Sequence, residues 1–215
     1  MNNDRFARQL SITLLSRRGK SGLVGEIMTT VYFVRHAEPN YNNHNDALRE
    51  LSANGLKGRK LVTDFFADKR IDVALSSPFK RAIDTIKDFT DLFELHIDII
   101  DDFRERKVDS EWIEDFTSFS RKQWNDFSYK LSDGECLQEV QDRNVSALKL
   151  VLDKFRGKNI IIGSHGTAIC TIIKFYDDSF GYDDFAKIKN KMPWIVEFAF
   201  DENARLLSIR KHDLF

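Results

Sequence analysis

One stretch, residues 31–38, constrains the fold of this chain more than any other. Four apolar residues, all β-branched or aromatic, occupy 31–34, and Arg35 and His36 follow before Pro39 breaks the run. An apolar run without alternation is typical of a strand buried on both faces, as in a parallel sheet covered by helices. Because ligands of open α/β sheets bind beyond the carboxyl ends of the strands, the stretch predicts an anion-handling site at Arg35 and His36.

Short apolar runs continue along the chain and alternate with helical patterns, which is typical of α/β folds. We predict further strands at 71–75, 97–100 and 159–163. The last of these is a second fully buried run. Alternation over 194–200, then a turn and a further run at 206–211, predict a C-terminal antiparallel hairpin.

Capping residues predict where the helices begin. Ser52 is expected to be the N-cap of one helix, and Ser77 with Pro78 at the first helical position is expected to begin the next. A long amphipathic helix is predicted after Gly134, and another helix directly after Gly166. The pattern as a whole predicts a three-layer α/β sandwich, in which helices flank a mostly parallel central sheet.

The two ends of the predicted domain are defined by composition. Residues 1–27 hold five basic and two acidic residues and no extended apolar segment, so we predict a loosely ordered N-terminal extension. Met28 stands just before the first strand, which makes it a candidate start. Residues 28–215 are then one α/β domain, a length that allows a sizeable core.

A helical cap insertion is predicted at about 108–131, which lacks a strand pattern. Trp112, Phe116 and Phe119 follow helical spacing there, with Trp124 and Phe127 beyond them. We favour an amphipathic helix that packs on the domain over an aromatic ligand cage. A cap above the site is compatible with both interpretations.

Charge and cysteine content exclude several classes of partner. The chain has 33 Lys and Arg against 34 Asp and Glu, so we expect no nucleic-acid partner. No apolar run approaches the roughly 18 residues that span a bilayer, so we expect no membrane association. Cys136 and Cys170 are far apart and suit core positions in a reduced, cytoplasmic protein.

Three strands of the predicted sheet end in charged or titratable groups: Arg35 with His36, Ser77 with Arg81 one turn later, and His165. Right-handed crossovers place the carboxyl ends of parallel strands at one edge, so these groups are expected to converge. Two guanidinium groups and two helix N-termini suit phosphate oxygens. Imidazoles beside them are then positioned for nucleophilic attack on phosphorus.

No metal or nucleotide motif accompanies these groups. HExxH and HxxxH spacings are absent, as is the GxxxxGK[ST] loop, and histidines paired with arginines disfavour a cation. We therefore expect no cofactor and no metal.

Three segments in order resemble the histidine phosphatase (phosphoglycerate mutase-like) superfamily. They are Arg-His-Ala-Glu at 35–38, Ser-Ser-Pro-Phe-Lys-Arg-Ala at 76–82 and Gly-Ser-His-Gly at 163–166. Leu-Ser at 51–52 with Gly55, and Asp-Gly-Glu at 133–135, also match. The resemblance spans roughly Thr30 to the C-terminus, and Ala37 replaces the commoner glycine.

This resemblance implies a role for each matched residue. His36 would be the nucleophile that forms a phosphohistidine, and Arg35, Arg81 and His165 would hold the phosphoryl oxygens. Asn42 matches a further phosphate contact found in some members.

Glu105 would be the general acid and then the base that activates water. The residues after it depart from the family pattern, so Asp109 or Glu111 could carry the proton instead. His44 lies in the loop after the nucleophile and could touch substrate.

We therefore predict a metal-independent phosphomonoesterase that acts on a small phosphorylated metabolite. Hydrolysis is favoured over phosphoglycerate mutase-type transfer or a bisphosphatase, because only one modest insertion covers the site and no surplus of basic residues suggests a second phosphate. A non-catalytic phosphate-recognition module is the alternative from another class.

Overall fold

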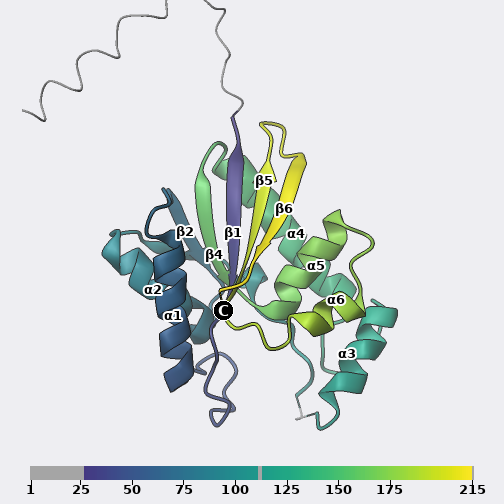
Figure 1. The fold of residues 1–215 in the computed structure, drawn as a ribbon. Coiled ribbons are helices and arrows are strands. Elements are labelled where there is room, and N and C mark those ends of the chain that lie inside the picture. The colour runs from purple at the N-terminus through teal and green to yellow at the C-terminus, as the bar shows by residue number, and fades with distance from the viewer. Residues whose placement is uncertain (1–26, 111–112, 215) are drawn as a thin grey trace, which may run out of the picture.

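The two unbroken apolar runs pair with each other at the centre of one sheet. β1 (Thr29–Arg35) lies parallel to β4 (Asn159–Ser164), and all of 160–162 is fully buried. The computed structural model describes residues 27–110 and 113–214, and within them six strands have the order β3-β2-β4-β1-β5-β6 (Figure 1). Burial on both faces explains why neither run alternates.

The remaining strands extend this pair in both directions. β2 (Val73–Ser76) is parallel to β4, and β3 (Ile97–Ile99) is parallel to β2. β5 (Trp194–Phe200) pairs antiparallel with β1, and β6 (Leu206–His212) pairs antiparallel with β5. The predicted mostly parallel sheet with its C-terminal hairpin is thereby confirmed.

Helices cover both faces of the sheet and complete the three layers. α1 (Ala53–Phe66) and α2 (Lys80–Leu92) cover one face; α4 (Leu137–Lys154) and α5 (Gly166–Tyr176) cover the other (Figure 1). Ile161 of β4 packs in the core on the α1 and α2 side of the sheet. Ile160 and Ile162 pack in the core on the α4 and α5 side. None of the described helices is long and apolar enough to cross a membrane.

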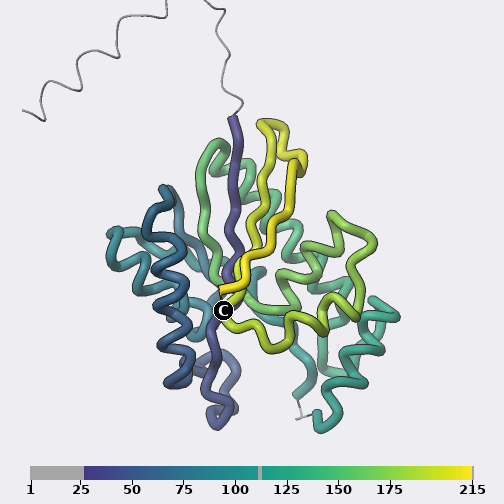
Figure 2. Tube along the Cα trace, in the orientation of Figure 1, coloured from purple at the N-terminus to yellow at the C-terminus, as the bar shows by residue number. Residues whose placement is uncertain are grey.

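Shorter helices lie near the carboxyl end of β1. They are the 3-10 turn η1 (Asp101–Phe103), α3 (Phe116–Asn125) and α6 (Tyr182–Lys187). Figure 2 shows the loop from β1 to α1 at this same lower end, and α3 and α6 lie at the lower right of the view. The sequence analysis did not predict α6.

Ser52 caps α1 as predicted, since its Oγ accepts a hydrogen bond from the Gly55 N–H at 3.0 Å. The prediction that Ser77 and Pro78 begin the next helix is wrong, because α2 begins at Lys80. The Ser77 hydroxyl lies 2.7 Å from Nε2 of His165 and accepts from the Phe79 N–H at 3.2 Å. These contacts hold 77–79 in a bend ahead of the helix.

The aromatic residues of the predicted cap divide between packing and a cavity wall. Trp124 packs against the rings of Phe127, Phe180 and Phe185, which agrees with the favoured core interpretation. Helix α3 begins at Phe116, and Trp112 lies outside the described residues. That the region forms a cap insertion stays a prediction.

Gly55 allows the first turn of α1 to contact the loop after β1. A Cβ at this position would lie 2.1 Å from the Glu38 carbonyl oxygen. We expect Gly55→Ala to lower the free energy of unfolding by about 1–3 kcal/mol, since the backbone must shift. Gly181→Ala is the control, because nothing lies within 4 Å of a Cβ there. Equal urea unfolding curves for the two variants would contradict this account.

Candidate active site

The carboxyl end of β1 is held between two neighbouring elements. The N–H of His36 donates to the Ser164 carbonyl of β4 at 3.0 Å, and the N–H of Ala37 donates to Oγ1 of Thr85 in α2 at 2.9 Å. His36 is only 7% exposed. The backbone therefore fixes where the His36 side chain begins.

A second contact determines which nitrogen of His36 is free. Nδ1 lies 2.8 Å from the carbonyl oxygen of Ala37. Because a carbonyl can only accept, Nδ1 carries the hydrogen, and Nε2 of the neutral ring keeps its lone pair. The imidazole is thus oriented as a nucleophile would need to be.

The environment keeps both central histidines neutral. Burial lowers the pKa of His36 well below its ordinary value, and the charges of Arg81 and Arg35 lower this pKa further. The hydrogen bond to Ala37 raises it, but by less. Burial and the Arg81 charge also lower the pKa of His165. Neutral imidazoles beside cationic guanidinium groups therefore mark this end of the sheet.

His165 caps α5 beside His36, and the centroids of the two rings are 5.3 Å apart. Its Nε2 lies 2.7 Å from Oγ of Ser77, whereas its buried Nδ1 has no hydrogen-bond partner in the described part of the chain. Ser77 Oγ already accepts from Phe79, so its own hydrogen is available to Nε2. In that arrangement Nδ1 of His165 carries a proton to donate.

Arg81 reaches the site from the first turn of α2 and is 3% exposed. Nη1 of Arg81 donates to the Asp46 carbonyl at 2.5 Å and lies 3.1 Å from the Asp46 carboxylate. The guanidinium also lies over the Phe79 ring, 4.9 Å from its centroid. Burial lowers the pKa of Arg81, whereas the nearby carboxylates of Asp46 and Glu105 raise it.

Arg49 is a third guanidinium in this neighbourhood, and the sequence analysis missed it. It pairs with Asp46 at 3.2 Å, its side chain is 13% exposed, and its charge lowers the pKa of both His36 and Arg81. No sequence signal identified it, because an arginine in a polar loop is ordinarily solvated.

Arg35 is held by the segment that follows α6. Its guanidinium donates to the carbonyls of Ile188, of Lys191 at 3.1 Å and of Lys189 at 3.3 Å. Nε is buried with no partner among residues 27–110 and 113–214, and a Cβ on Gly166 would lie 3.1 Å from it. Glycine at 166 therefore lets Arg35 lie against the start of α5.

Glu105 is brought to the same edge by the turn after η1. Its carboxylate accepts from the N–H of Thr167 in α5 at 3.2 Å and from the N–H of Arg106 at 2.9 Å. The Asp109 carboxylate instead accepts from the adjacent Ser110 N–H at 2.8 Å. Glu111 lies outside the described residues.

Asn42 stays a predicted phosphate contact, because its surroundings neither support nor contradict that role. Asn42 lies in an exposed turn, where its N–H donates to Oδ1 of Asn40 at 3.1 Å. Within the described residues, no hydrogen bond joins its side chain to Arg35, His36 or the other predicted site residues. His44 lies in the exposed part of the same loop.

A cavity of about 120 Å³ adjoins the site between α3 and α6. Arg35 and Glu105 line it together with the first residues of α5, and we call it the α3–α6 cavity. The other lining residues are Phe116, Thr117, Ser120, Gly166, Thr167, Tyr182, Phe185, Ala186, Ile188 and Lys189. The cavity thus opens from Glu105 toward the region of the predicted cap.

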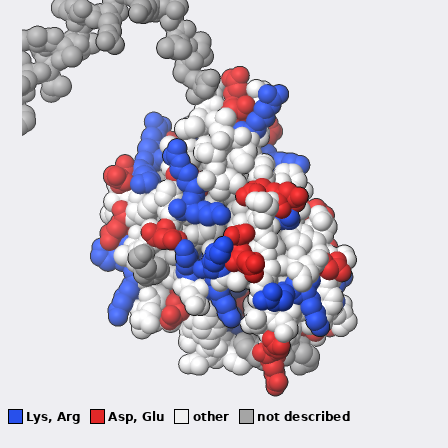
Figure 3. All heavy atoms as spheres, turned by 45° about the vertical axis from the view of Figure 1, so that its right-hand side comes forward, with Lys and Arg blue, Asp and Glu red and all other residues white. Residues whose placement is uncertain are grey.

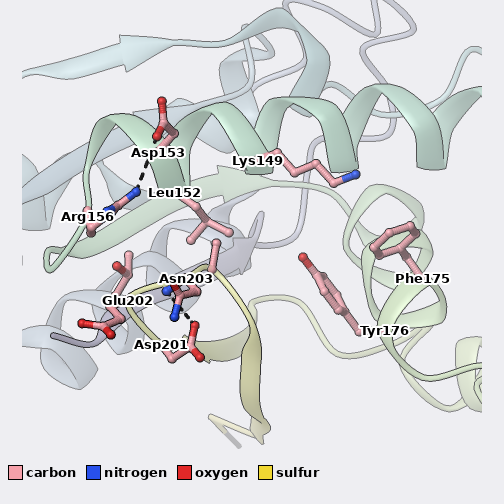
Figure 4. Close-up of a pocket in the computed structure, with 11 residues that line it drawn as sticks. Lys149, Leu152, Asp153, Arg156, Phe175, Tyr176, Asp201, Glu202 and Asn203 are labelled. Carbon is pink, nitrogen blue, oxygen red and sulfur yellow. Dashed lines mark hydrogen bonds and ion pairs between the residues drawn. The ribbon is translucent and has the colours of Figure 1, made fainter. Parts of the chain in front are cut away.

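A larger cavity of about 510 Å³ lies at the opposite end of β1 (Figure 4). It is lined by Thr29, the first residue of β1, by the end of α4 and by the turn 201–204. Among its lining residues, Arg156 pairs with Asp153 at 3.8 Å, and Asp201 accepts from the Asn203 N–H at 2.8 Å. None of the predicted site residues lines this cavity.

Neither a one-sign surface patch on the face drawn in Figure 3 nor a cluster of metal ligands in the described residues indicates a further site. On the face drawn in Figure 3, Lys and Arg side chains are interspersed with Asp and Glu. In the part of the chain that the structure describes, no three His, Cys, Asp or Glu side chains gather as a metal site requires.

Comparisons with known proteins agree with the geometry. Residues 31–208 match the model of the histidine phosphatase superfamily (branch 1). The uncharacterized phosphatase PhoE of Bacillus subtilis (strain 168) is 30% identical over 153 residues, which cover 68% of this chain and 76% of that protein.

Solved structures show the same fold at lower identity. YhfR of Bacillus stearothermophilus superposes with a TM-score of 0.70 at 18% identity, covering 83% of this chain and 94% of that one. A mycobacterial glucosyl-3-phosphoglycerate phosphatase gives 0.67 at 15% identity, with 86% and 98% covered. A phosphoserine phosphatase mutant from Entamoeba histolytica, in complex with phosphoserine, gives 0.66 at 20% identity, with 84% and 96% covered.

Because the buried histidines are neutral, acid should destabilise the folded protein. An unfolded histidine binds a proton below about pH 6.5, whereas folded His36 and His165, with pKa values lowered by burial, bind one only at lower pH. The unfolded state then holds more protons, so stability should fall below about pH 6.5, by at most about 1.4 kcal/mol per pH unit for each histidine.

Urea unfolding between pH 7.5 and 5.5 measures this slope. His36→Asn should reduce the change in the free energy of unfolding per pH unit by the contribution of one histidine. His96→Asn is the control, because His96 lies on the surface beside Asp98. The same slope in His36→Asn as in the unmodified protein would contradict the placement of a neutral imidazole there.

Proposed function

Because the chain belongs to the histidine phosphatase superfamily, we propose that it is a metal-independent phosphomonoesterase whose nucleophile is His36. The observation that best supports this proposal is the neutral His36 ring. Its Nδ1–H donates to the Ala37 carbonyl, and its Nε2 keeps its lone pair. Guanidinium groups at Arg35 and Arg81 supply the positive charge that a phosphoryl group requires.

In the first step, Nε2 of His36 attacks the phosphorus and forms an N–P bond. The bond between phosphorus and the ester oxygen breaks, and Glu105 gives its proton to the departing alkoxide. Arg35, Arg81 and the Nδ1–H of His165 stabilise the charge on the phosphoryl oxygens. The unpartnered Nδ1 of buried His165 supports its part, because a buried donor without a partner is costly.

In the second step, Glu105 takes a proton from water as the water oxygen attacks the phosphohistidine. The N–P bond breaks, His36 regains its lone pair and phosphate leaves. The hydrogen bond from the Thr167 N–H supports Glu105 in this role, because it holds the carboxyl group at the α3–α6 cavity, which Arg35 also lines. We propose no catalytic role for Asp109, whose carboxylate is held by its neighbour Ser110.

The size of the cavity and the names of two relatives support a proposal about the substrate class. The α3–α6 cavity beside Glu105 holds only about 120 Å³, which suits a small leaving alcohol. One structural relative is a phosphoserine phosphatase and another a glucosyl-3-phosphoglycerate phosphatase, and both names describe hydrolysis of a phosphorylated metabolite. We therefore propose a small phosphorylated metabolite as substrate.

His36→Ala should abolish turnover of p-nitrophenyl phosphate, since the proposed mechanism forms the N–P bond on His36. EDTA should leave turnover of the unmodified enzyme unchanged, because the proposed steps use no metal. His96→Ala, which removes a surface histidine, should keep full activity. Release of p-nitrophenolate measures all three, and full activity in His36→Ala would remove the nucleophile assignment.

Trapping labelled phosphate distinguishes the enzyme from a recognition module. Acid-labile label on His36 supports the covalent route. Binding of the ester with neither label nor turnover would instead favour a module that only recognises phosphate.

The proton donor can be tested through the leaving group. Glu105→Gln should slow hydrolysis of an alkyl phosphate by about 10²–10⁴-fold, the range of general-acid catalysis. The same variant should slow p-nitrophenyl phosphate far less in the first step, because nitrophenolate leaves without a proton. Asp109→Asn is the matched control and should show no such leaving-group dependence. If Asp109→Asn shows it and Glu105→Gln does not, the proton donor is Asp109.

A further inference from the structure

Arg106 is a buried cation that the proposed reaction does not use. It is 2% exposed, and its guanidinium lies 5.2 Å from the ring centroid of Phe116 and 5.5 Å from that of Phe119. Nη2 donates to Oγ of Ser120 at 3.2 Å, whereas buried Nη1 has no partner in the described part of the chain. Burial lowers the pKa of Arg106, whereas the nearby charge of Glu105 raises it.

An arginine buried in this way needs an explanation. A buried charge is costly unless it is paired, and a buried donor without a partner adds to that cost. Among the described residues Arg106 forms no ion pair, and aromatic faces supply only part of the missing interaction. A ligand with negative charge would supply the rest.

Arg106 lies directly behind the wall of the α3–α6 cavity. Phe116 and Ser120, which both contact its guanidinium, line that cavity, and so does the preceding residue Glu105. Because Ser120 Oγ accepts from Arg106, its own hydroxyl hydrogen is available to a group inside the cavity. A group in the cavity that accepts this hydrogen would be linked to the charge of Arg106 through Ser120.

Lys189 contributes a second cation from the α6 side of the same cavity. The lysines on either side of it are paired, Lys187 with Asp184 at 3.0 Å and Lys191 with Asp213 at 2.6 Å. Lys189 forms no ion pair with any residue that the structure describes. The cavity thus has an available cation at its rim and a buried one behind its wall.

We propose that the α3–α6 cavity binds the leaving group and selects phosphomonoesters whose alcohol carries a carboxylate on a small body. The inference rests on the proposed function, because Glu105 marks where the ester oxygen departs. The carboxylate would be held by the Ser120 hydroxyl, backed by Arg106, and by Lys189. The volume of about 120 Å³ suits a small body, and Phe116 and Phe185 contribute apolar surface to the cavity lining.

Two matched esters test this selection. Phosphoglycolate carries a carboxylate where ethyl phosphate carries a methyl group. Titration calorimetry on His36→Ala, which cannot turn over either ester in the proposed mechanism, should give at least tenfold tighter binding of phosphoglycolate. A preference below twofold would overturn the proposal.

Variants of the cavity identify the groups responsible. Lys189→Met and Ser120→Ala, each combined with His36→Ala, should lower the preference for phosphoglycolate at least fivefold. Lys187→Met should keep it, because Lys187 does not line the cavity and is paired with Asp184. Arg106→Lys should retain more of the preference than Arg106→Met. Should the latter fail to fold, Lys189→Met and Ser120→Ala decide alone, and an unchanged preference in both overturns the proposal.

The two proposals can fail separately. Turnover of p-nitrophenyl phosphate that depends on His36, without a preference for phosphoglycolate, would remove the inference and keep the phosphatase. A preference for phosphoglycolate in an enzyme that hydrolyses no ester would keep the carboxylate subsite and remove the reaction.

Discussion

The in-register pairing of β1 with β4 is the constraint on which the rest of this structure depends. Arg35 lies opposite Ser164, so the residues that follow, His36 and His165, leave the sheet at the same level. The Ser164 carbonyl accepts the His36 N–H, which extends the pairing one residue beyond the strand. A shift of one residue would flip the side chains of one strand relative to the other and would separate the residues that follow Arg35 and Ser164, which carry the two imidazole rings.

This constraint explains why so much was readable from the sequence. Two unbroken apolar runs identify central strands, and parallel strands joined by right-handed crossovers place their ends together. The convergence of Arg35, His36, Arg81 and His165 follows from that topology with no knowledge of side-chain geometry. Glu105 was named from the resemblance alone, and its hydrogen bond to the Thr167 N–H could not be read from spacing.

What the sequence did not predict depends on loops. Arg49 approaches His36 because the loop after β1 folds back toward α2, where Asp46 pairs with both Arg49 and Arg81. Arg35 is held by backbone carbonyls at 188, 189 and 191, which any sequence could supply. Ser77 and Pro78 suggested a helix start, but the His165 imidazole holds the Ser77 hydroxyl instead. In each case a tertiary contact outweighed a local preference.

The gathering of Arg35, Arg49 and Arg81 has a consequence for the energy of the free protein. Like charges that burial partly shields from water repel one another, and among the residues described Asp46 is the carboxylate that bridges two of them. A bound dianion relieves this repulsion whether it arrives as an ester or remains as free phosphate. In the proposed reaction, the product is therefore held by the same forces that hold the substrate. If the reaction runs as proposed, the charges that favour attack on phosphorus also slow the departure of phosphate, and release of the product becomes a slow step.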